Sequence, residues 1–187
     1  MRKLVVQQWV TVDNIAAEED GGLSFVSGEP FDATNPAFKT NGMAFIDSID
    51  TMILGANTYA QSKDYWPYAE EQGEFGEKLN NLTKFVASSK LEDAPWGDFP
   101  AATVTSDPVA TIRDLKEQDG KGLWLWGSLT LMRSLLDAGL VDEIRMMVCP
   151  VARGKGTRVF ADRQDLKLVE ATGFENGVVI MRYAIGK

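Results

Sequence analysis

Leu123-Trp124-Leu125-Trp126-Gly127-Ser128-Leu129-Thr130 is the stretch that decides the fold, because an apolar segment runs directly into a small polar turn. Its first four residues are all large and apolar, which predicts a strand covered on both faces. Met132 and Leu136 follow the turn at helical spacing, and Gly139 marks the end of the predicted helix. Parallel sheets are built from such strand, turn and helix units, so this stretch indicates an α/β fold.

Further strands and helices are expected to alternate along the rest of the chain. Apolar runs predict strands at residues 4–10, 51–54, 84–87, 102–105 and 143–148. Helices are expected after Thr34-Asn35-Pro36 and after Asp107-Pro108, where a capping residue precedes a proline, and from Asn57 onward. Loops are expected at residues 13–36, at the acidic segment 69–78 with a short helix toward Leu82, and at the surface connection 94–100.

The end of the chain has a different pattern. Two apolar segments, residues 166–174 and 178–183, flank Asn176-Gly177, which is the strongest short-range signal for a β-hairpin. Together with the alternating units, this predicts a mixed, mainly parallel sheet with helices on both faces and an antiparallel hairpin at its end. A length of 187 residues favours a single domain over residues 1–187.

The composition excludes several kinds of chemistry. The chain has no histidine and one cysteine, Cys149, so it has neither a Ser-His-Asp system nor a His- or Cys-based metal site, and an intrachain disulfide is impossible. Its net charge of −8 argues against nucleic-acid binding. No run of about 18 apolar residues is present, and residues 1–9 match neither a signal peptide nor a membrane anchor. A cytoplasmic protein is expected.

Three small polar clusters follow predicted strands. They are Gly55-Ala56-Asn57-Thr58, Ser88-Ser89-Lys90 and Gly127-Ser128-Leu129-Thr130. In open α/β sheets the ligand lies beyond the carboxyl ends of the strands, and free N–H groups at a helix start favour an anion. The clusters therefore predict a phosphate-binding edge, although such residues also serve as plain helix caps and turns. Neither a G-x-G-x-x-G nor a P-loop motif occurs.

Other residues leave alternatives open. The cationic loop Arg153-Gly154-Lys155-Gly156-Thr157-Arg158 could attract a phosphorylated ligand or could anchor itself electrostatically. The tryptophans could stack on a planar ring or belong to the core, which is the commoner place for a strand residue such as Trp124. Acid or base candidates are Asp13, Asp32, Asp47 and Asp50, and each is equally compatible with a surface charge.

These motifs, in this order, resemble the dihydrofolate reductase superfamily, and within it the reductase domain of riboflavin biosynthesis, the C-terminal half of the bifunctional deaminase/reductase. Residues 52–59 resemble the family's apolar strand followed by Gly-Arg-x-Thr-Tyr, and residues 84–91 its strand that starts with Lys and ends in Ser. Residues 125–131, 135–143, 150–151 and 154–160 are similar to the family core in order and spacing. Residues 174–179 resemble its final hairpin.

The resemblance implies a dihydrofolate reductase-like three-layer fold and a homodimeric reductase that takes hydride from NADPH. It implies that Gly55 to Thr58 and Ser88 to Lys90 hold the adenosine end of the cofactor, with Lys90 at the 2′-phosphate, and that Gly127 to Thr130 hold the pyrophosphate. The implied substrate is an aminopyrimidine ribosyl phosphate or a related small molecule. Because the cofactor supplies the hydride, this chemistry suits a chain without histidine.

The chain also departs from the family pattern. Ala56 stands where many relatives have the arginine that contacts the 2′-phosphate, Asn14 replaces a frequent glycine, and Ser128 is the second residue of what is a Gly-Gly pair in dihydrofolate reductases. No acid in residues 35–48 matches the proton-donating carboxylate of folate enzymes, so the catalytic residues stay unassigned. The alternatives are dihydrofolate reduction and a non-catalytic nucleotide- or flavin-binding dimer. Replacing Gly127 by valine is expected to abolish cofactor binding and to leave the fold largely intact.

Overall fold

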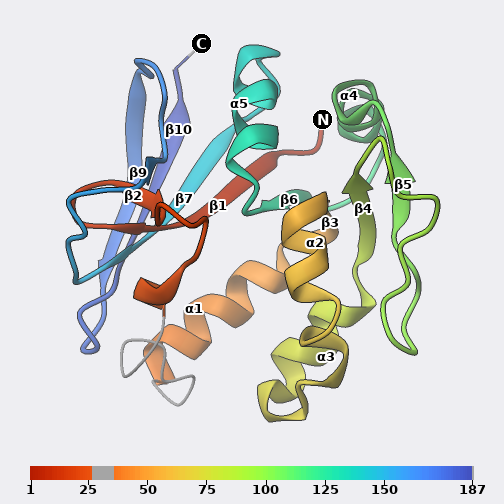
Figure 1. Cartoon of the computed structure of the whole chain (residues 1–187), viewed down its shortest axis with the longest axis horizontal. Helices are drawn as coiled ribbons and strands as arrows, with labels where there is room; N and C mark the ends of the chain where they lie inside the picture. The colour runs from red at the N-terminus through yellow and green to blue at the C-terminus, as the bar shows by residue number, and fades with distance from the viewer. Residues whose placement is uncertain (27–35, 187) are drawn as a thin grey trace.

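An eight-stranded sheet forms the centre of the molecule in the computed structural model, which describes residues 1–26 and 36–186 (Figure 1). Its strand order is β5-β4-β3-β6-β1-β7-β10-β9. The six strands β5, β4, β3, β6, β1 and β7 are parallel, and β10 and β9 are antiparallel to their neighbours. The strands are β1 Leu4–Thr11, β3 Ile49–Gly55, β4 Thr83–Ala87, β5 Thr103–Thr105, β6 Gly122–Trp126, β7 Glu143–Cys149, β9 Leu166–Gly173 and β10 Val179–Ile185.

Helices cover both faces of this sheet, and each face has its own apolar core. On one face lie α1 (Pro36–Asp47), α2 (Ala56–Ser62) and α3 (Gly73–Asn81), whose residues Ile46, Tyr59 and Leu79 pack with Trp124. On the other face lie α4 (Pro108–Glu117) and α5 (Leu129–Asp137), with Leu135 in the core. The predicted mixed, mainly parallel sheet with helices on both faces is therefore confirmed.

The predicted elements are found close to their expected positions. The expected strands are β1, β3, β4, β5 and β7, each within two residues at either end, and the hairpin around Asn176-Gly177 joins β9 to β10. Helix α1 begins at Pro36 as expected, whereas the proposed cap residues Thr34 and Asn35 lie outside the described residues. A small antiparallel pair, β2 (Ile15–Ala17) with β8 (Thr157–Arg158), was not predicted, because two- and three-residue strands leave no periodic pattern in the sequence.

The acidic segment 69–78 is only in part the solvated loop that its charge indicates, and the short helix predicted toward Leu82 is present as α3. Two short 3-10 turns, η3 Trp66–Tyr68 and η4 Glu70–Gln72, lead into α3, which begins at Gly73. Phe75 and Leu79 lie one helical turn apart on the side of α3 that faces the core, while the glutamates occupy the outer side. Burial of this apolar face, rather than the charge density, decides the structure of the segment.

The connection 94–100 lies at the surface for most of its length, as predicted, since Pro95, Gly97, Asp98 and Pro100 are exposed, but Trp96 is buried. Trp96 is 0% exposed, and its indole N–H donates to the Asn80 side-chain oxygen at 2.7 Å. Beside it, the buried ammonium of Lys84 donates to the carbonyl oxygens of Asn80 at 2.6 Å and Leu82 at 2.9 Å. Its Nζ lies 5.5 Å from the centre of the Trp96 ring. Trp96 belongs to the same core as Val86 of β4 and Leu79 of α3, so it anchors this connection to the protein.

Candidate functional site

The three predicted turns lie next to one another at the carboxyl edge of the parallel strands. In β3, Gly55 is paired with Ala87 of β4, and Leu54 is paired with Trp126 of β6. The turns that leave β4, β3 and β6 therefore occupy consecutive positions along one edge of the sheet. This is the convergence that the strand ends predict.

Two of these turns are in close contact. A Cβ atom built on Gly55 would lie 2.7 Å from the Cβ atom of Ser128, and one on Gly127 would lie 3.2 Å from Oγ1 of Thr58. Each turn thus presents bare backbone where the other turn places a hydroxyl-bearing side chain. Gly55 is buried, Asn57, Ser89, Lys90 and Thr130 are exposed, and the other residues of these turns are half-buried. The predicted site residues therefore lie together in one region, and solvent reaches this region at its exposed residues.

The turn after β6 has an unusual backbone. Gly127 has φ = 65° and Ser128 has φ = 50°, so two consecutive residues adopt the left-handed conformation. Glycine adopts this conformation without cost, whereas a β-branched residue is strongly disfavoured there. Valine at position 127 would have a strained backbone and its Cβ would meet Thr58, so the expected loss of cofactor binding in that variant should be accompanied by a loss of stability.

Strand β1 holds this turn from both sides. The Gly127 N–H donates to the Gln7 carbonyl oxygen at 3.2 Å, and the Gln8 side-chain amide donates to the Gly127 carbonyl oxygen at 3.1 Å. Gln8 is 5% exposed. Sequence reasoning missed this residue, although two glutamines in an otherwise apolar central strand are a usable signal, since a buried amide needs a partner.

Helix starts at this edge differ in how they are capped. The N-cap residues of α2 and α5 are Gly55 and Ser128, and neither makes a side-chain hydrogen bond to the first turn. Helix α4 follows β5, two strands beyond β3 in the sheet, and there the Asp107 carboxylate accepts from the Ala110 N–H at 3.0 Å. The first-turn donors of α2 and α5 thus lack the side-chain acceptor that α4 carries, which suits an external anion.

The turn after β4 is built around Ser88. Its hydroxyl oxygen accepts from the backbone N–H groups of Lys90 and Leu91, both at 3.1 Å. Its own N–H donates to the Thr105 carbonyl oxygen at 3.0 Å, which joins this turn to the end of β5. The Lys90 side chain is left exposed at the rim of the edge. Thr105 therefore belongs to the same edge, although the sequence did not single it out.

The tryptophans separate into core and edge residues. Trp96 and Trp124 are buried, which confirms the core interpretation of Trp124. Trp126 is half-buried directly before the Gly127 turn; its ring stacks on Trp124 at 4.9 Å between centroids and meets Trp66 edge-on at 5.2 Å. An aromatic wall thus leads from the core to the site.

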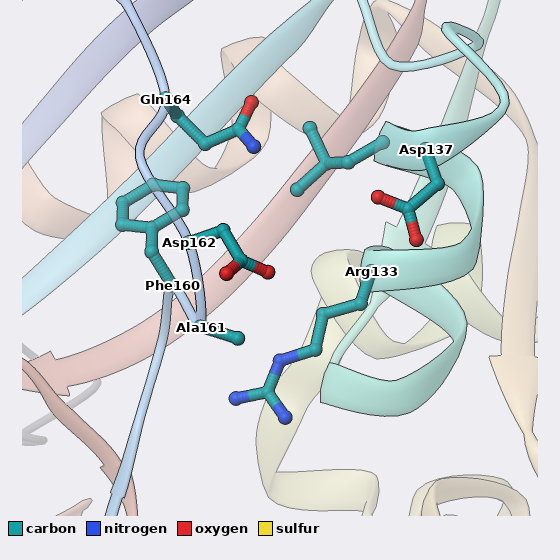
Figure 2. Close-up of a pocket in the computed structure, with 7 residues that line it drawn as sticks. Arg133, Asp137, Phe160, Ala161, Asp162 and Gln164 are labelled. Atoms are coloured by element: carbon teal, nitrogen blue, oxygen red, sulfur yellow. The ribbon is translucent and has the colours of Figure 1, made fainter.

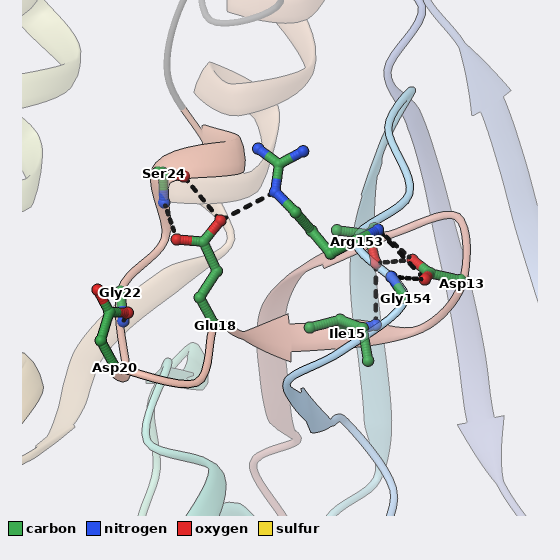
Figure 3. A network of polar contacts seen from close by, with 9 residues as sticks. Asp13, Ile15, Glu18, Asp20, Gly22, Ser24, Arg153 and Gly154 are labelled. Carbon is green, nitrogen blue, oxygen red and sulfur yellow. Dashed lines mark hydrogen bonds and ion pairs between the residues drawn. The ribbon is translucent and has the colours of Figure 1, made fainter.

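The cationic loop is anchored to the protein, as one of the two alternatives predicted. Figure 3 shows Asp13 accepting from the backbone N–H groups of Arg153 and Gly154, at 3.2 and 2.6 Å. The Arg153 guanidinium donates to Glu18 at 2.9 Å. The hydrogen bonds that Asp13 accepts lower its pKa to about 2; the bond from the Thr11 hydroxyl has the largest effect, followed by those from the N–H groups of Gly154 and Arg153. Asp13 is therefore a structural anion, and the adjacent Asn14 has the positive φ of 69° that a glycine would adopt freely.

Two of the other acid candidates form ion pairs with residues that do not belong to the three turns. Asp47, at the end of α1, pairs with Lys78 at 2.6 Å, and Asp50 pairs with Arg2 at the amino end of β3. Asp32 lies outside the described residues. In residues 39–46 of α1 no acid occurs, so that part of the helix offers no carboxylate as a proton donor.

A small hollow of about 150 Å³ lies apart from these turns, between α5 and residues 160–164. Figure 2 shows Arg133 and Asp137 of α5 facing Asp162 and Gln164 across it. The Arg133 guanidinium donates to the Arg158 carbonyl oxygen at 2.8 Å, so this side chain joins α5 to the end of β8.

Comparison with known proteins agrees with this architecture. A family model described as the RibD C-terminal domain matches residues 2–180. The uncharacterized protein YyaP of Bacillus subtilis (strain 168) is 27% identical over 188 residues, which are 97% of this chain and 94% of that protein.

Within residues 1–26 and 36–186, no helix combines the length and apolar character needed to cross a membrane.

Two solved structures have the same fold. One is a diaminohydroxyphosphoribosylaminopyrimidine deaminase/5-amino-6-(5-phosphoribosylamino)uracil reductase from Thermotoga maritima, with a TM-score of 0.65 and 16% identity over 99% of this chain and 57% of that one. The other is a dihydrofolate reductase from Schistosoma mansoni, with a TM-score of 0.61 and 15% identity over 99% of both chains. The fold is therefore dihydrofolate reductase-like.

Proposed function

This chain belongs to the RibD C-terminal domain family, and on that premise we propose that it is an NADPH-dependent reductase of the riboflavin-biosynthesis type. Its proposed substrate is an aminopyrimidine ribosyl phosphate or a related small molecule. The observation that supports this best is the contact between two helix starts that lack side-chain caps, at Gly55 with Ser128 and at Gly127 with Thr58. Bare backbone and free N–H groups at one edge are what a pyrophosphate requires.

The proposed roles of the turns follow from their places along the edge. Residues Gly127 to Thr130 would hold the pyrophosphate with the first-turn N–H groups of α5. Residues Gly55 to Thr58 and Ser88 to Lys90 would hold the adenosine end, with the exposed Lys90 ammonium at the 2′-phosphate. NADPH, when bound, supplies the hydride. The protein then has to position the acceptor and exclude water from it.

Trp126 is the residue proposed to limit the acceptor site. It is half-buried, precedes the Gly127 turn, and is braced by Trp124 and Trp66. A planar pyrimidine packed on this wall would be held against the edge and shielded from solvent on one side. We therefore propose that the pyrimidine ring of the substrate packs on Trp126.

A second candidate function is a nucleotide-binding protein without turnover. It is favoured by the lack of an acid in residues 39–46 of α1 and by Ala56 at the position where many relatives have arginine. The same lack of an acid makes dihydrofolate reduction a weaker candidate than reduction of a pyrimidine.

A titration with NADPH, followed by quenching of tryptophan fluorescence, tests the proposal. We expect saturable quenching, a loss of affinity of about tenfold in Lys90→Gln, and no change in Lys155→Gln, an exposed lysine of the loop after β7. Oxidation of NADPH is then measured with a panel of pyrimidine, pterin and quinone acceptors. An absence of quenching removes the reductase proposal, and binding without oxidation across the panel favours the second candidate.

We also propose that residues 1–187 form one domain that works as a homodimer. The outer strand β9 supports this proposal, because its Leu168 and Val169 are 54% and 51% exposed at an open sheet edge. Sedimentation velocity is expected to give a dimer for the wild-type chain and a monomer for Leu168→Lys. A monomeric wild-type chain at micromolar concentration contradicts this part of the proposal.

A further inference from the structure

A cavity of about 540 Å³ lies at the end of the sheet opposite the proposed cofactor edge. It opens beside the first residues of β1, β3 and β6, and its walls are the second half of α1 and the side chains of β7, β9 and β10. Gly122, the first residue of β6, lines this cavity, whereas the Gly127 turn follows the last residue of the same strand. The cavity is therefore separate from the three turns.

A buried arginine with neutral partners forms part of the wall. Arg145, in the middle of β7, is 3% exposed. Its guanidinium donates to the side-chain oxygens of Gln7 and Asn41 and lies 4.5 Å from the centre of the Phe45 ring. Burial lowers the pKa of Arg145 to about 10, which leaves it charged at neutral pH. A buried cation normally has an anionic partner; none of these direct contacts is one, and Glu143 and Glu170 act on Arg145 only through their electrostatic field.

The carboxylates in the cavity are bound to another residue. Arg182 of β10 donates to both oxygens of Glu143, at 2.7 and 3.1 Å, and to Glu170 at 2.7 Å. Among the described lining residues the cations are Arg2, Lys3, Lys121, Arg145 and Arg182, and the carboxylates are those two glutamates. Arg2 is paired with Asp50. The cavity is thus a cationic region in a chain whose net charge is −8.

We propose that this cavity binds a small organic anion, whose carboxylate or phosphate group is held by Arg145. The planar guanidinium suits either group, Lys3 and Lys121 at the rim attract it, and Phe45 with Val5 offers an apolar wall for the rest of the molecule. A volume of this size accommodates a metabolite rather than a bare ion. The proposal stands independently of the proposed reductase function, because the two sites share no residue.

Isothermal titration of the full chain with citrate and with inorganic phosphate, at ionic strength matched with sodium chloride, tests this proposal. We expect saturable binding of citrate, phosphate or both. Arg145→Gln is expected to weaken binding at least tenfold, while Arg163→Gln, the same change at an arginine whose side chain is 87% exposed, leaves it unchanged. Circular dichroism verifies that each variant folds.

A second variant keeps the test valid if Arg145→Gln does not fold. Glu170→Gln removes one of the two carboxylates bound to Arg182, at a half-exposed position, so it should tighten anion binding severalfold. Gly55→Ala alters the opposite edge and should leave citrate binding unchanged. The proposal is overturned if neither anion binds more than chloride does, if Gly55→Ala but not Arg145→Gln removes binding, or if binding appears only with a change in oligomeric state in sedimentation.

Discussion

Gly55 faces the side chain of Ser128 so closely that a methyl group on Gly55 would come within 2.7 Å of the Ser128 Cβ atom. The two residues are 73 positions apart in the sequence; Gly55 is the last residue of β3, and Ser128 lies in the turn that follows the neighbouring strand β6. Each is the cap of a helix that starts at the site edge. Their contact therefore couples the starts of α2 and α5.

A pair of substitutions tests this coupling. Gly55→Ala should displace the Ser128 turn and lower the affinity for NADPH by at least tenfold, because the first-turn N–H groups of α5 would move. Adding Ser128→Gly removes the obstructing atoms, after which the nearest remaining atom is the Ser128 Cα at 4.0 Å. The double variant should regain most of the affinity in a fluorescence titration, and Ser128→Gly alone should retain it. Equal affinities in the single and double variants would contradict the coupling.

Lys84 should make stability depend on alkaline pH. Burial lowers the pKa of its ammonium to about 8, whereas the unfolded chain keeps the ordinary value of 10.5. Between these values the unfolded state binds more protons, so the free energy of unfolding should rise with pH, by on the order of 2 kcal/mol. Urea unfolding at pH 7.5 and pH 10 measures this rise.

The matched variants for this experiment are two lysine-to-methionine changes. Lys84→Met should abolish the rise, since it removes the titrating group, while Lys155→Met at an exposed position should preserve it. An unaltered rise in Lys84→Met would show that other groups are responsible.

Asp13 should make the cationic loop sensitive to acid. Its pKa is lowered to about 2, from 3.8, by the Thr11 hydroxyl and the N–H groups of Gly154 and Arg153. A carboxylate with a lowered pKa stabilises the fold above about pH 4, and this contribution is lost as the pH falls toward 2. Hydrogen exchange of the Gly154 amide should therefore accelerate, relative to the intrinsic rate, from pH 4 to pH 2.5. In Asp13→Asn that amide should exchange rapidly at both pH values, and in Asp64→Asn it should behave as in the wild type.

Cys149 should be chemically inert in the folded protein. Its side chain is fully buried at the end of β7, and burial raises the pKa of the thiol to about 12. Because the thiolate is the reactive form, an aromatic disulfide reagent should react more than about a hundredfold more slowly than in urea. Rapid labelling without denaturant would show that the carboxyl end of β7 opens.

Much of the fold was predictable because apolar runs mark the strands directly. The run at residues 123–126 becomes β6, and the Asn176-Gly177 turn joins β9 to β10. The position of the candidate site follows from the same information, since parallel strands bring their carboxyl ends to one edge. Whether those turns bind NADPH stays a prediction.

The remaining features depend on contacts between distant residues. Trp96 lies in a segment rich in proline and glycine, and its burial follows from distant contacts, its hydrogen bond to Asn80 and its packing in the core beside Lys84. Arg145 is one of two charged residues in a mostly apolar strand, and its partner Asn41 lies 104 positions earlier in the chain. Local patterns do not contain such pairings, which form when α1 and α3 pack against the rest of the protein.

The two hydrogen bonds from β1 to Gly127 have a kinetic consequence. With its N–H group and its carbonyl oxygen both engaged, the peptide after β6 is preorganised, so its conformational entropy is lost when the chain folds and not when a dinucleotide arrives. Association at this edge should then be a rapid encounter with a rigid surface, and differences in affinity between nucleotides should arise mainly in how slowly they dissociate.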